Sequence, residues 1–344
     1  MLLYKDLLSH YINRWHIPLL LAILFAGLGL STAHAAGFQK LESENLQIGI
    51  WYPSDTPTST QRLGPFETEI ALNAPVRVGQ HEVVLFSHGN GGRFRNHYLT
   101  AEALADAGYI VIAPQHQADY LIGGSNTAMA LNNRYNELAT ALQIVRANPN
   151  FNNHIVSSSV HGIGYSLGGA TIMLAAGAGF SSQRVYDFCR VQEEADPEFC
   201  EGPGFISRLL QLFQKEPNLP LPPTTDPFRN PPLITGKAVL VAPVYQGLDL
   251  EQPLSMTNLM VIAIEGDNIA KPKFHAKPLI EAAKSQIQTD LENVAGHHFA
   301  FIAPFPKWLT DKEDIFVAKD PEGFDRPAFL KTVNKIILDE LDGS

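Results

Sequence analysis

The chain has 344 residues and a formal charge of −10 at pH 7, which argues against nucleic acids and anionic membrane surfaces as partners. Hydrophobic residues make up 45% of the chain and charged residues only 17%, as is typical of a globular protein with a large core. Strand-like and helix-like patterns alternate after the leader and no internal repeat is present, so we expect one α/β domain of about 300 residues, although length alone permits two.

The first 35 residues have the pattern of an export signal. Lys5 and Arg14 precede an apolar stretch at 17–30, and residues 33–35 (Ala-His-Ala) are typical of a small-x-small cleavage site. The apolar stretch is shorter than the about 20 residues that a membrane-spanning helix needs. We expect cleavage after residue 35 and a periplasmic or secreted protein without a stable membrane span. An uncleaved membrane anchor is the alternative.

Residues 81–92 and 155–178 carry the first catalytic signals. An apolar run before residue 164 predicts a strand, residues 164–168 (Gly-Tyr-Ser-Leu-Gly) predict a sharp turn, and the small residues that follow predict a helix through residue 178. Such an elbow exposes the hydroxyl of its serine, here Ser166, and leaves no room for side chains two residues before and after it. The alternative is a glycine-rich turn with an idle serine.

A glycine-rich loop upstream predicts an oxyanion hole. The apolar run 83–86 predicts a buried strand that leads into residues 87–92 (Ser-His-Gly-Asn-Gly-Gly). Acyl transfer needs two N–H donors for the tetrahedral oxyanion, each contributing about 2.7–4 kcal/mol to catalysis. We assign them to Leu167, which follows the serine, and to Asn90 in the loop. His88 precedes the serine in the chain, so we expect it to shape the loop rather than act as the base.

The catalytic acid is expected after a later strand. The continuous apolar run 259–264 predicts a strand that is covered on both faces, and Asp267 follows it at the rim where α/β sheets place their sites. Glu265 lies closer to the strand body, and Asp249 follows the preceding predicted strand at 238–242; both are alternatives. The alternative for Asp267 itself is a purely structural role as a turn residue, because it lies in the turn-forming sequence Gly-Asp-Asn.

A histidine after the last predicted strand, 291–295, completes the triad. His297 and His298 are adjacent there and point in different directions, so only one of them can be the base. We favour His298, with His297 lining the pocket or solvated. The order Ser166, Asp267, His298 is the one that this type of elbow normally uses. His275 follows Asp267 too closely to begin a loop beyond the last strand.

These motifs together resemble the Ser-dependent α/β-hydrolases, in the bacterial branch related to dienelactone hydrolases and platelet-activating-factor acetylhydrolases. The resemblance covers most of the chain after the leader and includes residues 50–53, 87–92, 108–114, 164–169, 241–243, 266–267, 298–299 and 323–326. It implies an α/β-hydrolase fold and a serine carboxylesterase with the site residues assigned above. Dienelactone hydrolases use cysteine at the elbow, and the eukaryotic acetylhydrolases carry their acid after the sixth strand, where this chain has Ala242 and Pro243, so neither specificity is transferred.

Residues 180–235 interrupt the strand and helix pattern. The segment contains Cys189 and Cys200, the only two cysteines, which an oxidising compartment would join; two free thiols are the alternative. One helical face at 205–213 is apolar, followed by a proline-rich run at 217–232. The segment is either a cap over Ser166 or a small helix packed on the domain.

Three further residues invite a functional interpretation. Arg134 is predicted to start a helix that ends at Ala147 and to form a structural ion pair, and His116 and Asp119 are predicted to line the rim of the sheet. No histidine pair has the i, i+4 spacing with a glutamate that a zinc-binding helix needs, so we expect neither a metal nor another cofactor.

The sequence therefore predicts an exported serine hydrolase that cleaves small-molecule or lipid esters through Ser166, His298 and Asp267. A peptidase or amidase that uses the same triad is one alternative, since the elbow serves both leaving groups. A hydrolase-fold protein that binds a ligand without catalysis is another, because fold does not imply function.

Overall fold

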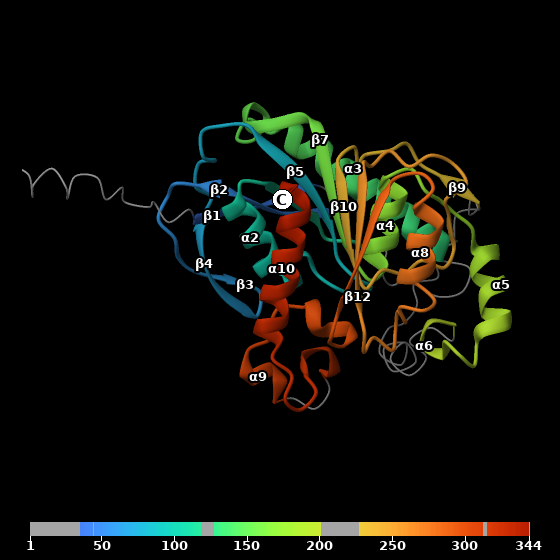
Figure 1. Ribbon diagram of the computed structural model, residues 1–344. Helices are drawn as coiled ribbons and strands as arrows, with labels where there is room; N and C mark the ends of the chain where they lie inside the picture. Colours follow the sequence, from blue (N-terminus) through green and yellow to red (C-terminus); the bar gives the residue numbers. More distant parts are fainter. Residues whose placement is uncertain (1–34, 44, 118–126, 201–226, 312–314, 344) are drawn as a thin grey trace, which may run out of the picture. The chain divides into compact units, whose positions relative to one another are not determined.

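The computed structural model describes residues 35–343 except for 44, 118–126, 201–226 and 312–314. The main sheet contains ten strands: β1 (Ala35–Ser43), β2 (Leu46–Ser54), β3 (Ser59–Leu63), β4 (Phe66–Leu72), β5 (His81–Ser87), β6 (Ile110–Pro114), β7 (Ile155–Tyr165), β10 (Lys237–Val241), β12 (Asn258–Ile264) and β13 (Gln288–Val294). A smaller sheet contains β8 (Gly179–Phe180), β9 (Phe228–Arg229) and β11 (Leu248–Asp249). Figure 1 shows these elements along the chain.

The α-helices are α2 (Tyr98–Ala107), α3 (Thr127–Ala147), α4 (Leu167–Ala175), α5 (Ser182–Gln192), α6 (Pro197–Cys200), α8 (Ala276–Ala283), α9 (Lys307–Thr310) and α10 (Arg326–Asp342). Short 3₁₀ helices are η1 (Phe94–His97), η4 (Asn152–His154), η5 (His298–Phe301) and η6 (Phe316–Ala318). Helices separate β5 from β6, β6 from β7, β7 from β10 and β12 from β13, which confirms the predicted α/β class.

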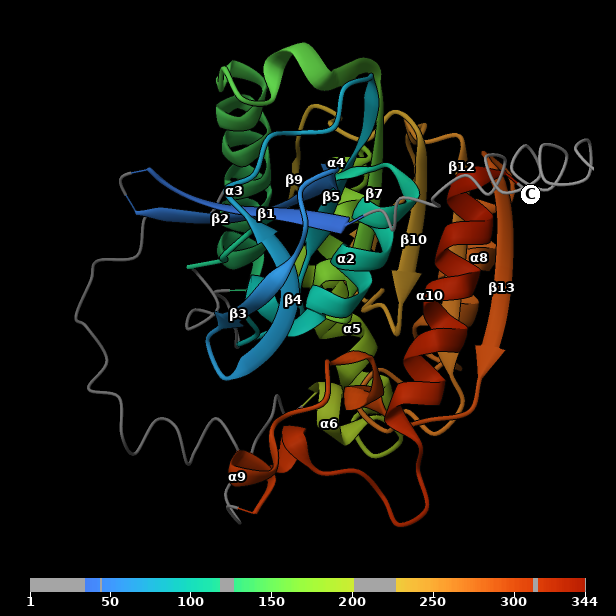
Figure 2. The same ribbon diagram turned by 90° about the vertical axis from the view of Figure 1, so that its left-hand side faces the viewer.

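The main sheet is mostly parallel, in the order β13-β12-β10-β7-β5-β6-β2-β1-β4-β3. Parallel pairing joins every neighbour from β6 to β13, whereas β2 runs antiparallel to both β6 and β1. The carboxyl ends of β5, β7, β10, β12 and β13 therefore meet at one edge of the sheet. Figure 2 shows the arrows of β10 and β13 pointing toward this edge.

Helices cover both faces of the central strands, and the side chains of β5 show how. Val83 and Leu85 belong to one buried cluster with residues of α3, α4 and α8, while Val84 and Phe86 belong to a second cluster with residues of α2 and α10. Successive side chains of a strand point to opposite faces, so a strand buried on both faces needs a continuous apolar run. Figure 1 shows the two helical layers on either side of the strands.

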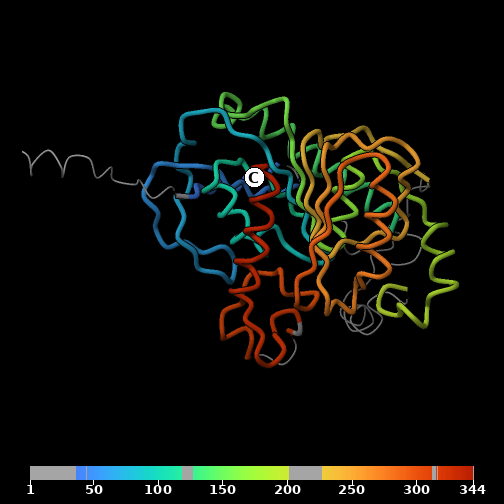
Figure 3. Tube along the Cα trace, viewed as in Figure 1, coloured from blue at the N-terminus to red at the C-terminus, as the bar shows by residue number. Residues whose placement is uncertain are grey.

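The last helix, α10, brings the C-terminal part of the chain back to the sheet. Its N-cap residue Asp325 accepts a hydrogen bond at 3.0 Å from the N–H of Ala328, which satisfies one of the free donors at the start of a helix. The helix then packs beside α2, which comes from the first third of the chain (Figure 3). Residues of α10 and α2 thus belong to the same buried cluster as Val84 and Phe86.

The structure corrects one helix boundary. The helix that we predicted to start at Arg134 begins at Thr127, and Arg134 lies in its interior and is fully buried. Residues 128–131 are Ala, Met, Ala and Leu, which are strong helix formers, so helical propensity favours the earlier start and only the two asparagines at 132 and 133 oppose it. Burial of Ala128 and Leu131 against the sheet stabilises the two extra turns.

Two predictions fall outside the described residues. These are the leader up to residue 34, and the apolar helical face at 205–213 with most of the proline-rich run that follows it. None of the helices in the part of the chain that the structure describes combines the length and the apolar character needed to cross a membrane.

Candidate active site

Ser166 lies between β7 and α4, at the carboxyl-end edge of the sheet. Its backbone has φ 54° and ψ −119°, a conformation that costs of order 1–3 kcal/mol for a residue with a side chain. Three backbone hydrogen bonds hold it there: its N–H donates to the Val241 carbonyl at 3.0 Å, and its carbonyl accepts from Gly169 at 2.9 Å and from Val244 at 3.0 Å. The strain is therefore maintained by the neighbouring strand β10 and by the start of α4.

Close packing explains the two glycines that flank the serine. A Cβ on Gly164 would collide with the backbone of Gly168, and a Cβ on Gly168 would collide with the Ser87 carbonyl oxygen at the end of β5. The sequence predicted that both positions have no room for a side chain. The structure adds the reason: the elbow packs directly on the neighbouring strand β5.

His298 bridges Ser166 and Asp267. Its Nε2 lies 3.0 Å from Ser166 Oγ, and its Nδ1 lies 2.7 Å from Asp267 Oδ2. These are hydrogen-bond distances, and all three residues are at most 7% exposed. Because a carboxylate only accepts hydrogen bonds, Nδ1 carries the proton and Nε2 is left with a lone pair directed at the serine hydroxyl.

Asp267 is held as a carboxylate. Burial alone raises its pKa, but hydrogen bonds from His298 and from the backbone N–H groups of Ala270 and Ile269 outweigh burial, so the pKa of Asp267 is below its usual value. Both N–H groups donate to Oδ1 at 2.8 Å, which leaves Oδ2 for the histidine. The aspartate is thus fixed in ionisation and in orientation.

The neighbouring histidine, His297, faces away from Ser166. Its Nε2 lies 2.9 Å from Asp320 Oδ1, and its ring packs edge-on against Phe324. Asp320 in turn pairs with Arg326, whose Nη1 donates to the carbonyls of Phe299 and Ile302. His297 therefore belongs to the support of the turn that carries His298.

The other acid and base candidates lie in different surroundings. Asp249 pairs with Arg184 and Arg229, and the side chain of Glu265 is exposed at the end of β12. His275 is buried, 3.2 Å from Asp196 Oδ2, and its Nδ1 accepts from the N–H of Tyr245. None of these three contacts Ser166 or His298 among the interactions of the described residues.

The two predicted oxyanion donors belong to segments that adjoin Ser166. Leu167 is the first residue of α4, so its N–H is one of the four at a helix start that have no carbonyl partner within the helix. A Cβ built on Gly89 would lie 3.4 Å from Ser166 Cβ, so the loop that contains Asn90 passes beside the serine. Leu167 and the loop that contains Asn90 are thus both neighbours of Ser166.

His88 shapes this loop, as the sequence suggested. Its Nδ1 donates to the Gly89 carbonyl at 2.7 Å, and its Nε2 accepts from the N–H of His116 at 3.2 Å. The Gly89 carbonyl also accepts from the N–H of Gly92 at 3.1 Å. A carbonyl and the N–H of the same planar peptide point in opposite directions, so these two bonds fix the direction of the Asn90 N–H.

The sequence missed one contact of the catalytic histidine. Tyr165 Oη donates to the His298 carbonyl at 2.7 Å, and the two rings pack against each other with centroids 5.4 Å apart. Tyr165 precedes the serine within the elbow motif, but nothing in the motif indicates where its ring points.

The prediction that His116 lines the rim is wrong, because its side chain is buried beneath the loop. Asp119 lies outside the described residues.

The two cysteines are joined. Cys189 in α5 and Cys200 in α6 form a disulfide across a separation of 11 residues, which confirms the predicted pair. The bond holds together two helices that have no fully buried residues of their own. A short crosslink of this kind contributes about 3 kcal/mol by restricting the unfolded chain.

The chain was compared with protein-family profiles and with curated proteins. No family profile matches it, and no curated protein matches it. In the part of the chain that the structure describes, no group of three or more His, Cys, Asp or Glu side chains is arranged to hold a metal ion.

Proposed function

We propose that this protein is a serine hydrolase of the α/β-hydrolase fold that cleaves carboxylic esters. The observation that carries the proposal is the continuous hydrogen-bonded chain from Ser166 Oγ through His298 to Asp267. A serine hydroxyl is a weak nucleophile on its own, and a neutral histidine whose other nitrogen is held by a carboxylate is the arrangement that activates it.

The sheet topology supports the assignment to this fold. The elbow follows β7 in the middle of the sheet, the acid follows β12, and the histidine follows β13 at the sheet edge. The three side chains thus occur in the chain order Ser, Asp, His that goes with a strand-to-helix nucleophile elbow. The three side chains meet at the carboxyl ends of parallel strands, which is the edge where α/β proteins have their active sites.

The proposed reaction proceeds through an acyl-enzyme. Ser166 Oγ attacks the ester carbonyl while its proton moves to His298 Nε2, and the N–H groups of Leu167 and Asn90 stabilise the resulting oxyanion. Collapse of the tetrahedral intermediate breaks the ester bond, and His298 gives its proton to the departing alcohol. Water then attacks the acyl group by the same steps, and Asp267 stabilises the imidazolium each time.

We also propose that the protein acts in the periplasm or outside the cell. The Cys189–Cys200 disulfide supports this location, because disulfides persist in oxidising compartments. The pattern of the leader points the same way. The substrate class that we propose is a small-molecule or lipid ester.

The test is hydrolysis of p-nitrophenyl esters by the purified chain, together with labelling by a fluorophosphonate probe. We expect turnover and labelling in the wild-type protein and neither in Ser166→Ala. Wild-type activity in that variant would refute the assignment of the nucleophile.

Matched ester and amide substrates separate an esterase from a peptidase or amidase with the same triad. A higher kcat/KM for the ester supports the proposal, and a higher value for the amide favours the peptidase. A folded wild-type protein that neither turns over nor reacts with the probe would favour a binding protein without catalysis.

A further inference from the structure

A second polar network lies beneath the proposed oxyanion loop, and it surrounds a buried arginine. Arg134 projects from the interior of α3 and has no exposed surface. Burying a guanidinium is costly unless its N–H groups are well paired. The hydrogen-bond partners of Arg134 therefore indicate its structural role.

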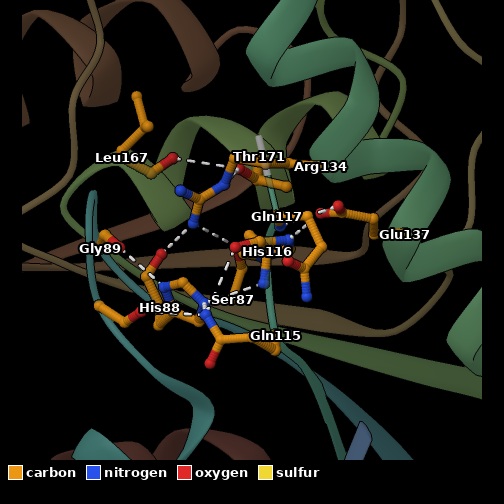
Figure 4. A network of polar contacts seen from close by, with 11 residues as sticks. Ser87, His88, Gly89, Gln115, His116, Gln117, Arg134, Glu137, Leu167 and Thr171 are labelled. Atoms are coloured by element: carbon orange, nitrogen blue, oxygen red, sulfur yellow. Dashed lines mark hydrogen bonds and ion pairs between the residues drawn. The ribbon is translucent and has the colours of Figure 1, made fainter. Parts of the chain in front are cut away.

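Two of these partners belong to the two segments that carry the proposed oxyanion donors. Arg134 Nε donates to Thr171 Oγ1 at 3.1 Å, and Thr171 lies in α4, the helix that begins at Leu167. Arg134 Nη2 donates to the His88 carbonyl, in the loop that carries Asn90. Figure 4 shows the guanidinium between the two segments.

A chain of hydrogen bonds continues from the same guanidinium. Nη2 of Arg134 lies 3.4 Å from Ser87 Oγ, which lies 2.9 Å from His116 Nε2, and His116 Nδ1 lies 2.7 Å from Glu137 Oε2 (Figure 4). Glu137 comes from the same helix as Arg134 and also accepts from the N–H of Gln117 at 2.9 Å.

The direction of every bond in this chain is fixed. Burial, and then the positive charge of Arg134, hold the pKa of His116 and of His88 well below the usual value of a histidine, so both rings are neutral. The His116 proton is on Nδ1, facing the Glu137 carboxylate, and Nε2 accepts from the Ser87 hydroxyl. Ser87 is itself fully buried, so this serine, histidine and carboxylate do not form a second nucleophilic site.

We propose that Arg134 is a positioning residue for the oxyanion hole. Its guanidinium ties the His88–Asn90 loop to α4 and thereby sets the separation of the Asn90 and Leu167 N–H groups. The inference rests on the proposed function for its catalytic consequence, while the tie itself is a property of the fold. Donors that are misplaced by even 1 Å lose much of their stabilisation of the transition state.

The planar guanidinium is what the tie requires. It presents several N–H groups in a rigid fork and can reach Thr171 and His88 from opposite sides, whereas a lysine ammonium is a compact point charge on a flexible stem. Arg134→Lys therefore keeps the positive charge and removes the bridge. Arg146, on the same helix, is exposed and donates to the Ser157 carbonyl, away from the oxyanion loop, so Arg146→Lys is the matched control.

The first measurement is catalytic. With p-nitrophenyl acetate we expect Arg134→Lys to lower kcat by about 10²-fold, the loss seen when one oxyanion donor is removed, with KM within about threefold. Inhibition by phenylboronic acid, which forms a tetrahedral adduct with serine, should weaken by a similar factor. Arg146→Lys should match the wild type in both. A wild-type kcat and boronate affinity in Arg134→Lys would overturn the proposal.

The second measurement does not depend on catalysis. Hydrogen exchange followed by mass spectrometry should show faster exchange of residues 87–92 in Arg134→Lys and no change in Arg146→Lys. Unchanged exchange of this peptide would refute the tie even if the wild-type protein proved to have no esterase activity, whereas an inactive wild type with the expected exchange would refute only the proposed function.

Thr171→Val is a second test of the same contact, to be used if the Arg134→Lys protein does not fold. It removes the hydroxyl that accepts from Arg134 Nε at nearly constant volume. We expect faster exchange of residues 87–92 and a kcat lowered by about tenfold, which corresponds to about 1.4 kcal/mol. Wild-type exchange and kcat in Thr171→Val would contradict the proposal.

Discussion

The substitution Asp267→Asn tests the triad through a single atom. Asp267 Oδ1 accepts two backbone N–H groups at 2.8 Å, and Oδ2 faces His298 Nδ1 at 2.7 Å. An asparagine has only one acceptor oxygen, and the two N–H groups hold that oxygen at the Oδ1 position. Its NH₂ group then replaces Oδ2 and faces the histidine.

The consequence is a change of tautomer. With a donor opposite Nδ1, His298 places its proton on Nε2, so the nitrogen that lies 3.0 Å from Ser166 Oγ becomes a donor and can no longer accept the serine proton. The wrong tautomer lowers kcat by about 10⁴-fold in a serine triad, which corresponds to about 5.4 kcal/mol of barrier. We expect a loss of this size in Asp267→Asn, with KM little changed.

The assay is the initial rate of p-nitrophenyl ester hydrolysis at pH 7 to 8, with folding checked by circular dichroism. Asp249→Asn is the matched control, because this aspartate was the alternative acid from the sequence but lies in β11 of the smaller sheet and pairs with Arg184 and Arg229. A loss of less than tenfold in Asp267→Asn would refute the reasoning. So would an equal loss in Asp249→Asn, which would make Asp249 a competing acid.

Three further substitutions test the surroundings of the site. His297→Ala removes a contact with Asp320 that faces away from Ser166, so kcat should stay within about threefold; a loss above about 100-fold would make His297 the base. Gly168→Ala places a methyl group against the Ser87 carbonyl and should cost about 3 kcal/mol or more in urea unfolding, whereas Gly323→Ala, which has open space and φ 78°, should cost about 1 kcal/mol; equal costs would contradict this. Burial raises the pKa of Glu102 to about 7, so the folded state binds a proton that the unfolded state releases, and the cost of ionising Glu102 is absent below about pH 4.5 and complete above about pH 7. Glu102→Gln should therefore stabilise the protein at pH 8 by at most about 3 kcal/mol and leave stability at pH 4 unchanged, and an equal gain at both values would refute the assignment.

The sequence by itself determined the fold class, because the signals for it are local. The apolar runs that became β5, β10 and β12 are continuous, as strands covered on both faces require. The same locality accounts for Gly164, whose Cβ would collide with the backbone of Gly168 four residues later, whereas the collision that excludes a side chain at Gly168 is with Ser87 on a different strand. The disulfide was predictable because only two cysteines are present.

Tertiary structure alone decided which side chains meet. His297 and His298 are chemically identical neighbours, and only the backbone of the turn directs one ring to Ser166 and the other to Asp320. In the same way, three predicted acids follow strands, but only Asp267 reaches His298. A local pattern cannot choose between such candidates, because the choice depends on side-chain directions at the edge of a folded sheet.

The sequence singled out Arg134 and His116 separately but did not predict the network that joins them. Its members come from the end of β5, the segment after β6, the interior of α3 and the interior of α4, and they meet only when these elements pack. From the sequence, Arg134 was predicted to form a structural ion pair at a helix start, and its complete burial was not expected because long charged side chains are almost never fully buried. Burial of the helix against the sheet reverses that expectation and turns a charged side chain into a tie between two segments of the site.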